Sequence, residues 1–326
     1  MMPNESVESA TPTVIASGDD RGHLLTEQAN PASQDLDRRS SLELVDLFNQ
    51  EDLKTVAAIA GAREPLAIAV DLAAASLRSG GRLFYVGAGT SGRLGVLDAA
   101  ECPPTFCSDP EMVQGILAGG DAALVRSSEA LEDRTEDGAA AIAQRRIGPL
   151  DTVVGITAGG TTPYVHGAIN AARAAGAKTV FMACVPTDQV PPPGGQVDAD
   201  IRLLTGPEIL AGSTRLKAGT ATKMALNILS TGAMVHLGKV YGNRMVDVAV
   251  TNTKLRDRAV RIVRDLTGCG RSQAADLLDR AGNRVKLALV MHWTGLDVAA
   301  AERLLADHGG QVRPAIAAIN PTHPNA

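Results

Sequence analysis

The sequence predicts an α/β fold, a doubly wound parallel sheet with helices on both faces, followed by a helical C-terminal subdomain. Short apolar runs, such as residues 83–86 and 151–157, alternate with segments of helical periodicity, which is typical of parallel sheets. Hydrophobic residues make up 45% of the 326 residues but aromatic residues only 2%, so we expect a core of Ala, Val, Leu and Ile. From residue 214 onward, strand-like runs give way to long helical segments punctuated by glycines.

The chain is predicted to divide into a polar N-terminal tail, a layer of N-terminal helices, an α/β domain, a helical subdomain and a Pro-rich C-terminal tail. Ser40 and Glu43 have the spacing of a capping box, which opens a helix expected to run to Phe48. A second helix is expected over 51–62. The predicted boundaries are 1–22 for the disordered tail, 23–82 for the helices that pack on the core, 83–240 for the α/β domain, 241–316 for the helical subdomain and 317–326 for the last tail.

Charge and composition exclude several classes of protein. The net charge is −5 and no block of Lys or Arg occurs, so we expect no nucleic-acid partner. No apolar run approaches the roughly 20 residues of a membrane span, and no secretory signal is evident, so we expect no membrane association and a cytoplasmic location. The four cysteines form no CxxC pair, which favours reduced thiols, and the six scattered histidines predict no metal site.

The glycine-rich turn over residues 87–92 follows an apolar strand and formally matches GxGxxG, the dinucleotide-binding pattern. The acidic residue expected at the end of the next strand is missing, and Pro103 and Pro104 are expected to end the following helix early. A second turn over 158–162 also carries hydroxyls, and two such turns suit one phosphate monoester better than a dinucleotide. The alternative is an ordinary tight connection at each turn. The candidate phosphate ligands are Gly89, Thr90, Ser91, Gly92, Gly160, Thr161 and Thr162.

Carboxylates near these turns are candidates for acid and base catalysis. Glu101 precedes a stiff Cys-Pro-Pro sequence in apolar surroundings, where desolvation can raise a carboxyl pKa. Glu129, Glu132 and Glu136 share one face of a helix predicted to open at Asp121, and one of them is a candidate to face Glu101 across the sheet edge. A solvated helix face is the alternative interpretation. Lys217, at the start of a later helix, is a candidate to add positive charge beside the anion, or simply part of a capped helix start.

Several long motifs resemble the N-acetylmuramic acid 6-phosphate etherase family. These are residues 86–106, 162–165, 212–223, 229–234 and 238–241, and the similarity runs from about Leu25 to slightly beyond residue 297. The resemblance implies a sugar isomerase (SIS) domain over 83–240, a homodimer and no metal or nucleotide cofactor. It also relates the chain to sugar-phosphate isomerase domains and to the glucokinase regulatory protein.

The resemblance implies a carbon–oxygen lyase of peptidoglycan recycling, which cleaves the D-lactyl ether of N-acetylmuramic acid 6-phosphate. Elimination and then water addition would give N-acetylglucosamine 6-phosphate and D-lactate. By resemblance, Glu101 in Ala-Glu-Cys-Pro-Pro matches the family's proton donor, and Glu132 in the segment 129–133 matches its second catalytic glutamate, the expected base at C2. Glu129 would contact substrate, and Ser91 with its turn would bind the phosphate.

One position departs from the family pattern. Gly159 stands where relatives commonly carry serine, so the second turn lacks one expected hydroxyl, and backbone N–H groups with Thr161 or Thr162 are expected to compensate. Two other functions are kept as alternatives: an aldose–ketose isomerase acting on an amino-sugar phosphate, because it also removes a C2 proton, and a non-catalytic sugar-phosphate sensor.

Overall fold

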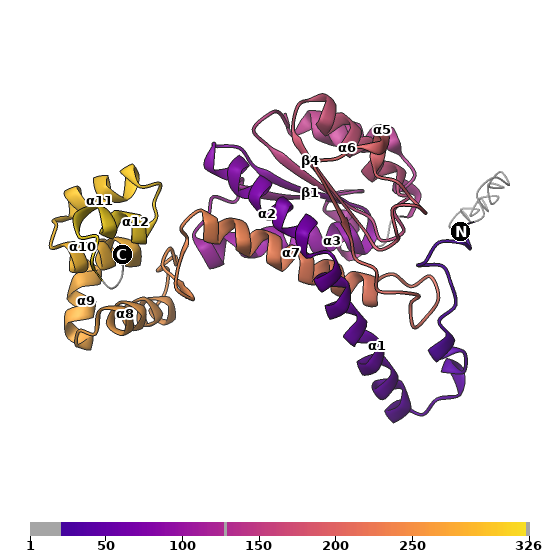
Figure 1. Cartoon of the computed structure of the whole chain (residues 1–326), viewed down its shortest axis with the longest axis horizontal. Coiled ribbons are helices and arrows are strands. Elements are labelled where there is room, and N and C mark those ends of the chain that lie inside the picture. Colours follow the sequence, from indigo (N-terminus) through magenta and orange to yellow (C-terminus); the bar gives the residue numbers. More distant parts are fainter. Residues whose placement is uncertain (1–20, 127–128, 324–326) are drawn as a thin grey trace, which may run out of the picture.

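A five-stranded sheet forms the centre of the molecule (Figure 1). The computed structural model describes residues 21–126 and 129–323, so the expected tail over 1–22 lies almost entirely outside the described residues. The strand order is β2-β1-β3-β4-β5, and every pairing is parallel. This confirms the predicted α/β fold. The strands are β1 (Leu83–Gly87), β2 (Val113–Leu117), β3 (Thr152–Ile156), β4 (Lys178–Ala183) and β5 (Ala199–Arg202).

Helices cover both faces of this sheet, and alternate residues of each strand point to opposite layers. Leu83 and Tyr85 pack with α2 (Arg63–Arg78), α3 (Gly89–Phe106) and α7 (Lys217–His236). Phe84 and Val86 pack on the other side against α6 (Pro163–Ala174), which in turn packs on α5 (Thr135–Gln144). Because both faces are covered, β1 is buried along its whole length.

Helix α1 (Ser41–Gly61) is one continuous helix where two were expected. The capping box at Ser40 is present in full, and buried residues at Leu47, Glu51, Thr55 and Ala58 recur every three or four positions. These buried residues form a continuous stripe that packs against α7. The helix therefore continues through residues 49–50, where a break was expected. Figure 1 shows α1 extending away from the layered core, after the short helices η1 (Pro31–Ser33) and η2 (Leu36–Arg38).

Helix α3 does not stop at Pro103 and Pro104, as the sequence had predicted, but includes both and ends at Phe106. The prolines remove two N–H donors only in the last turns, and the N–H of Cys107 still donates to the carbonyl of Pro103. Cys102 and Phe106 are buried in the core, so their packing holds the last turn in place.

The prediction of an acidic helix that begins at Asp121 is also wrong. The segment forms a four-residue helix α4 (Ala122–Val125), a 3-10 turn η3 (Glu129–Leu131) and then α5, so Glu129, Glu132 and Glu136 do not share one helix face. Asp121 makes no capping hydrogen bond that would start a longer helix. Glu132 lies between η3 and α5, outside any helix.

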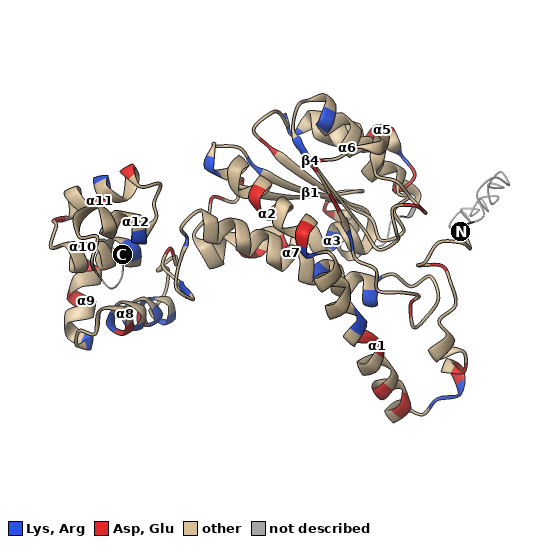
Figure 2. Cartoon of the chain, viewed as in Figure 1, with Lys and Arg blue, Asp and Glu red and all other residues tan. Residues whose placement is uncertain are grey.

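Five helices follow α7 and enclose a hydrophobic cluster of their own. They are α8 (Thr253–Thr267), α9 (Arg271–Arg280), α10 (Val285–Thr294), α11 (Val298–Asp307) and α12 (Val312–Ile319). This confirms the helical C-terminal region, although α12 extends three residues into the segment expected to be a tail. Figure 2 shows acidic and basic residues along α8, where Asp257 pairs with Arg261 of the same helix and with Arg271 of α9.

Two short features were not expected from the sequence. A small antiparallel hairpin, β6 (Val240–Tyr241) and β7 (Arg244–Met245), connects α7 to the C-terminal helices, and η4 (Pro193–Gly195) lies in the loop before β5. Within the described ranges, no helix is both long and apolar enough to cross a membrane.

Candidate active site

A pocket of about 200 Å³ lies at the carboxyl ends of β1 and β3, which are neighbours in the sheet. This edge is where parallel α/β sheets bind ligands. Both glycine-rich turns contribute to the pocket, as does the start of α7. Its lining consists of Arg21, Leu24, Glu27, Ala88, Gly89, Thr90, Ser91, Glu132, Thr157, Ala158, Gly159, Thr161, Thr162, Gly212, Thr214, Gly219 and Thr222.

The first turn brings Gly89, Thr90 and Ser91 to the pocket as the first residues of α3. The first N–H groups of a helix have no partner within the helix, so this end favours an anion. Gly89 has φ +52°, a conformation that glycine adopts readily. Gly92, also predicted to bind phosphate, does not line the pocket. A Cβ there would collide with the carbonyl of Gly87 and the side chain of Leu117, so Gly92 allows close packing of α3 on the sheet.

The second turn places Gly159, Thr161 and Thr162 on the opposite wall. Gly160, predicted as a ligand, is buried outside the pocket lining with φ +79°, and its carbonyl accepts a 2.6 Å hydrogen bond from His166 Nε2. At Gly159 a Cβ would meet its nearest neighbour, Thr26 Oγ1, only at 3.7 Å. Space for a side chain is therefore present at Gly159, where the family resemblance led us to expect serine.

Glu132 reaches the same pocket and is half-buried there. Its Oε1 accepts a 2.8 Å hydrogen bond from Thr162 Oγ1, and its carbonyl accepts one of 3.0 Å from the N–H of Tyr164. These two bonds tie the segment between η3 and α5 to the start of α6. The structure thus brings a carboxylate together with seven hydroxyl side chains: Thr90, Ser91, Thr157, Thr161, Thr162, Thr214 and Thr222.

Comparison with known proteins identifies the family of this chain. The model of the glucokinase regulatory protein N-terminal SIS domain matches residues 65–173, and the model of the C-terminal lid domain of that protein matches residues 242–286. An N-acetylmuramic acid 6-phosphate etherase from Nostoc sp. (strain PCC 7120) is 72% identical over 298 residues, which cover 91% of this chain and 96% of that protein. This chain belongs to the N-acetylmuramic acid 6-phosphate etherase family.

Two further etherases give the same result. The protein from Trichormus variabilis is 70% identical over 303 residues, covering 93% of this chain and 98% of its own length. The protein from Synechocystis sp. is 70% identical over 298 residues, covering 91% and 97%. The SIS match includes both pocket-forming turns, whereas the lid match begins after α7 and covers the hairpin's second strand through the start of α10.

Glu101, which the etherase resemblance marks as the proton donor, does not line the pocket of its own chain. It is exposed and lies 12 residues beyond Gly89 on α3, so the helix places it roughly 18 Å from that end. It borders a separate cavity of about 120 Å³ between α3 and α7, lined by Leu94, Leu97, Asp98, Glu101, Lys223, Leu226 and Asn227.

Lys217 is fully buried and points away from the predicted anion site. Its Nζ forms a 2.7 Å ion pair with Glu51 Oε2 and donates to the carbonyl of Thr205 at 3.1 Å. The carboxylate of Glu208 accepts hydrogen bonds from the N–H groups of Lys217 and Ala218, which caps the start of α7. Lys217 therefore fixes α7 to α1 and does not contact the pocket, contrary to the binding role expected for it.

Sequence reasoning missed the residues that reach the pocket from outside the two turns. Arg21, Leu24 and Glu27 come from the N-terminal segment, and Gly212 and Thr214 from the loop before α7. The only sequence signal is that Glu27 and the loop before α7 fall within the region of family resemblance, which begins at about Leu25. The side chain of Glu129 lies outside the described part of the chain. No group of three or more His, Cys, Asp or Glu among the described residues is arranged to hold a metal ion.

Proposed function

We propose that this chain cleaves the D-lactyl ether of N-acetylmuramic acid 6-phosphate, a step of peptidoglycan recycling, as a carbon–oxygen lyase without cofactor. The observation that carries the proposal is the hydrogen bond from Thr162 to Glu132 at the wall of a pocket rich in hydroxyls. This hydrogen bond orients a carboxylate beside the proposed phosphate site. Removal of a sugar C2 proton requires a base that is positioned in this way.

In the proposed mechanism, Glu132 acts as the base on the ring-opened sugar. The C1 aldehyde acidifies the C2 proton, which Glu132 accepts as the C3–O bond breaks and a C2=C3 double bond forms. The lactyl oxygen leaves with a proton from the general acid, and water then adds across the double bond with its hydroxyl at C3. Thr162 donates a hydrogen bond to Oε1 of Glu132. Within the described part of the chain, Oε2 accepts no hydrogen bond. We therefore favour Oε2 as the atom that accepts the proton.

The phosphate is proposed to bind at the start of α3. Thr90 and Ser91 offer hydroxyls there, next to the free N–H groups and the positive end of the helix dipole. Thr161 faces the same space from the second turn, and Arg21 is the cationic side chain in the lining. These groups together can neutralise and hydrogen-bond a phosphate monoester without a metal ion.

Glu101 is proposed to reach the pocket of a second copy of the chain in a homodimer, since it is distant from its own pocket. It lines one small cavity with Leu97 of α3 and Leu226 of α7. Exposed apolar side chains occur on α3, α7 and α1: Leu97, Ile228, Leu53 and Val56. Exposed apolar side chains of this kind are suited to burial against an identical subunit.

A subunit-mixing experiment tests both glutamates and the dimer together. Glu101→Gln and Glu132→Gln are each expected to abolish D-lactate release while the circular dichroism spectrum stays unchanged. Mixed at equal amounts under conditions of subunit exchange, they should recover about a quarter of wild-type activity, because half of the dimers would be hybrids with one intact site. Wild-type-like release from both single variants would refute the proposal, and no recovery on mixing would place both glutamates in one subunit.

The same assay separates the alternatives. An isomerase would convert an amino-sugar phosphate without releasing D-lactate, and a sensor would bind it without turnover. We also propose a domain boundary near residue 240, because the hydrophobic cluster beyond it shares no buried member with those of the sheet. The boundary near residue 82 stays a prediction from the sequence, since α2 and β1 belong to one cluster. A reducing, cytoplasmic location is proposed because all four cysteines are unpaired.

A further inference from the structure

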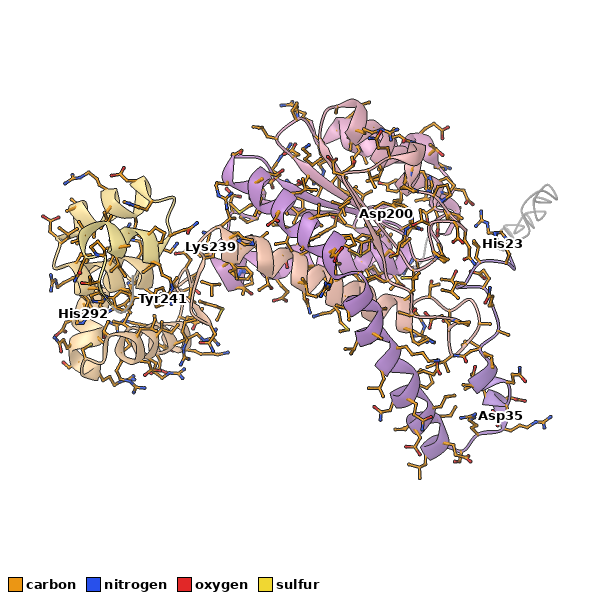
Figure 3. The ribbon with its side chains drawn as sticks, viewed as in Figure 1. His23, Asp35, Asp200, Lys239, Tyr241 and His292 are labelled. Carbon is orange, nitrogen blue, oxygen red and sulfur yellow. The ribbon has the colours of Figure 1, made fainter. Side chains whose placement is uncertain are left out.

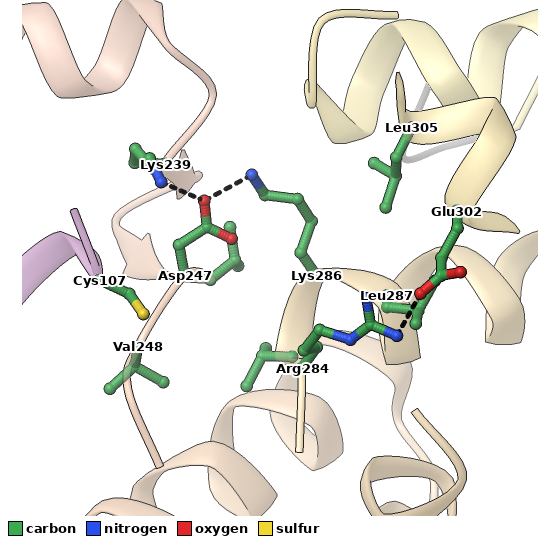
Figure 4. Close-up of a pocket in the computed structure, with 11 residues that line it drawn as sticks. Cys107, Lys239, Asp247, Val248, Arg284, Lys286, Leu287, Glu302 and Leu305 are labelled. Atoms are coloured by element: carbon green, nitrogen blue, oxygen red, sulfur yellow. Dashed lines mark hydrogen bonds and ion pairs between the residues drawn. The ribbon is translucent and has the colours of Figure 1, made fainter. Parts of the chain in front are cut away.

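A second cavity, of about 460 Å³, lies where the end of α3 meets the hairpin and the C-terminal helices (Figure 4). We call it the junction cavity. Its lining consists of Cys107, Lys239, Val246, Asp247, Val248, Arg284, Val285, Lys286, Leu287, Glu302 and Leu305, and none of these residues borders the candidate active site. Its volume lies in the range of sites for small organic ligands.

One wall of the junction cavity carries two ammonium groups that share a single carboxylate. Lys239 and Lys286 reach Asp247 Oδ2 from opposite sides, at 3.2 Å and 2.7 Å (Figure 4). The side chains of Lys286 and Lys239 are only 12% and 21% exposed, so water solvates their charges poorly. Figure 3 shows Lys239 where α7 leads into the C-terminal helices.

Arg284 and Glu302 form a separate ion pair on the far wall. The lining therefore holds three cationic side chains and two carboxylates, a surplus of one positive charge in a chain whose net charge is −5. Burial lowers the pKa of Lys286, the nearby charge of Lys239 adds to this effect, and Asp247 opposes it. A single additional negative charge between the two lysines would balance the cluster.

The rest of the lining is apolar and rigid. Val246, Val285 and Leu287 are each at most 2% exposed, and Val248 and Leu305 are also buried. Lys286 lies in the first turn of α10, and its backbone N–H donates a 3.1 Å hydrogen bond to the carbonyl of Val246. The first residues of α10 line the cavity, and no side chain of the described residues caps this helix start, so the positive end of its dipole is close to the cavity.

We propose that the junction cavity binds a small amphipathic organic monoanion, with its carboxylate beside the ammonium groups of Lys239 and Lys286, next to Asp247, and its apolar body against Val248, Leu287 and Leu305. A dianion such as a phosphate monoester fits less well, because it would leave one negative charge in excess. The bound molecule would touch Cys107 on the α/β core and α10 and α11 of the C-terminal helices, so it would bridge the two parts of the chain.

Octanoate is a suitable probe, and Trp293 is the natural reporter. Trp293 is the one tryptophan of the chain and belongs to α10, whose first turn lines the cavity. Titration of the full chain with octanoate should give a saturable change in tryptophan fluorescence at one site. 1-Octanol, which has the same apolar body without the charge, and octyl phosphate, a dianion, should each bind at least about 10-fold more weakly.

Substitutions then assign the binding to the lysine pair. Lys286→Met should weaken octanoate binding about 10-fold or more, and Lys286→Arg should retain it because the charge remains. Lys178→Met, which removes a half-exposed lysine outside the cavity, is the matched control and should bind as wild type. If Lys286→Met does not fold, as judged by circular dichroism, Lys239→Met provides the same test at a more exposed position.

Thiol reactivity supplies an independent readout. Cys107 is exposed, whereas Cys102 and Cys184 are buried, so Cys107 should react first with 5,5′-dithiobis(2-nitrobenzoate), and octanoate should slow that reaction in wild type but not in Lys286→Met. Octanol binding as tightly as octanoate, octyl phosphate binding more tightly, or unchanged octanoate binding by Lys286→Met would each overturn the proposal. None of these measurements depends on the proposed etherase activity.

Discussion

Thr162 and Glu132 are joined by a 2.8 Å hydrogen bond between Oγ1 and Oε1, across 30 residues of sequence. Thr157 Oγ1 lies 2.8 Å from the same Thr162 hydroxyl. Because the single hydroxyl proton of Thr162 goes to the carboxylate, Thr157 donates to Thr162. This chain of two hydroxyls starts at the end of β3 and fixes the orientation of Glu132 at the pocket wall.

Replacing Thr162 with valine should therefore reduce catalysis by misplacing the base. Thr162→Val keeps the shape of the side chain but removes the donor, and kcat for D-lactate release is expected to fall about 10- to 100-fold. Thr162→Ser restores the hydroxyl and should recover most of kcat. Steady-state kinetics of both variants check this prediction, and equal kcat values for the serine and valine variants would contradict it.

Gly159 offers a direct test of the second turn. Gly159→Ser enters open space, so the free energy of unfolding should change by less than about 0.5 kcal/mol, while the new hydroxyl lowers KM for the sugar phosphate. Gly160→Ser is the matched control: φ is +79° and a Cβ would meet Val185 and Val190 at 3.0 and 3.1 Å. Urea denaturation should show that Gly160→Ser lowers the free energy of unfolding by about 1 kcal/mol or more.

The buried ion pair of Lys217 and Glu51 should make stability depend on pH in acid. Burial acts to raise the pKa of Glu51, but hydrogen bonds from Lys217, Lys54 and Asn30 outweigh it and lower the pKa from 4.5 to about 2. A lowered carboxyl pKa stabilises the fold fully above about pH 4.5, and that stabilisation is lost as the pH falls toward 2.

Lys217→Met should accordingly cost about 3 kcal/mol of unfolding free energy at pH 7, and the difference from wild type should shrink between pH 4.5 and pH 2. Lys178→Met, which breaks the ion pair with Asp198 at a lysine 51% exposed, should cost less than about 1 kcal/mol. Urea denaturation at several pH values measures both. A Lys217→Met difference that stays constant down to pH 2 would argue against the ion pair as its cause.

Asp98 should show the opposite pH dependence. Burial raises the pKa of its carboxyl, although Ser230 Oγ donates to Oδ1 at 3.1 Å. A raised pKa means that the fold is favoured when the group is protonated, so this contribution is lost as the pH rises above the usual value of 3.8. Asp98→Asn should therefore raise Tm at pH 8, and Asp71→Asn, at a side chain 76% exposed, should leave Tm unchanged.

Local sequence patterns determined most of the α/β core. The apolar run at 83–86 became β1, and the two glycine-rich turns came together because both follow parallel strands that are adjacent in the sheet. Patterns failed where packing overrides local preference. Pro103 and Pro104 stay helical because Cys102 and Phe106 are held in the core, and the acidic segment after Asp121 breaks although its charges have helical spacing.

Glu132 was predicted through the family resemblance, whereas the hydroxyl residues of the candidate site were predictable because they lie in turns that follow a strand. Thr90, Ser91, Thr161 and Thr162 met that condition, and the structure brings them together. Lys217 looked like an anion ligand because the sequence does not reveal that Glu51, 166 residues away, supplies its partner. Arg21 and Glu27 were missed for the same reason, because long-range packing brings them to the pocket.

Helix α3 joins three features that lie far apart on the surface. Its first turn borders the candidate active-site pocket, Glu101 lies in its second half, and Cys107 directly after it borders the junction cavity. Eighteen helical residues form a rod about 27 Å long. A rotation of such a rod by about 5° around one end displaces the other by about 2 Å, which is enough to change hydrogen-bond distances. A tilt of α3 would therefore alter the walls of both cavities at once.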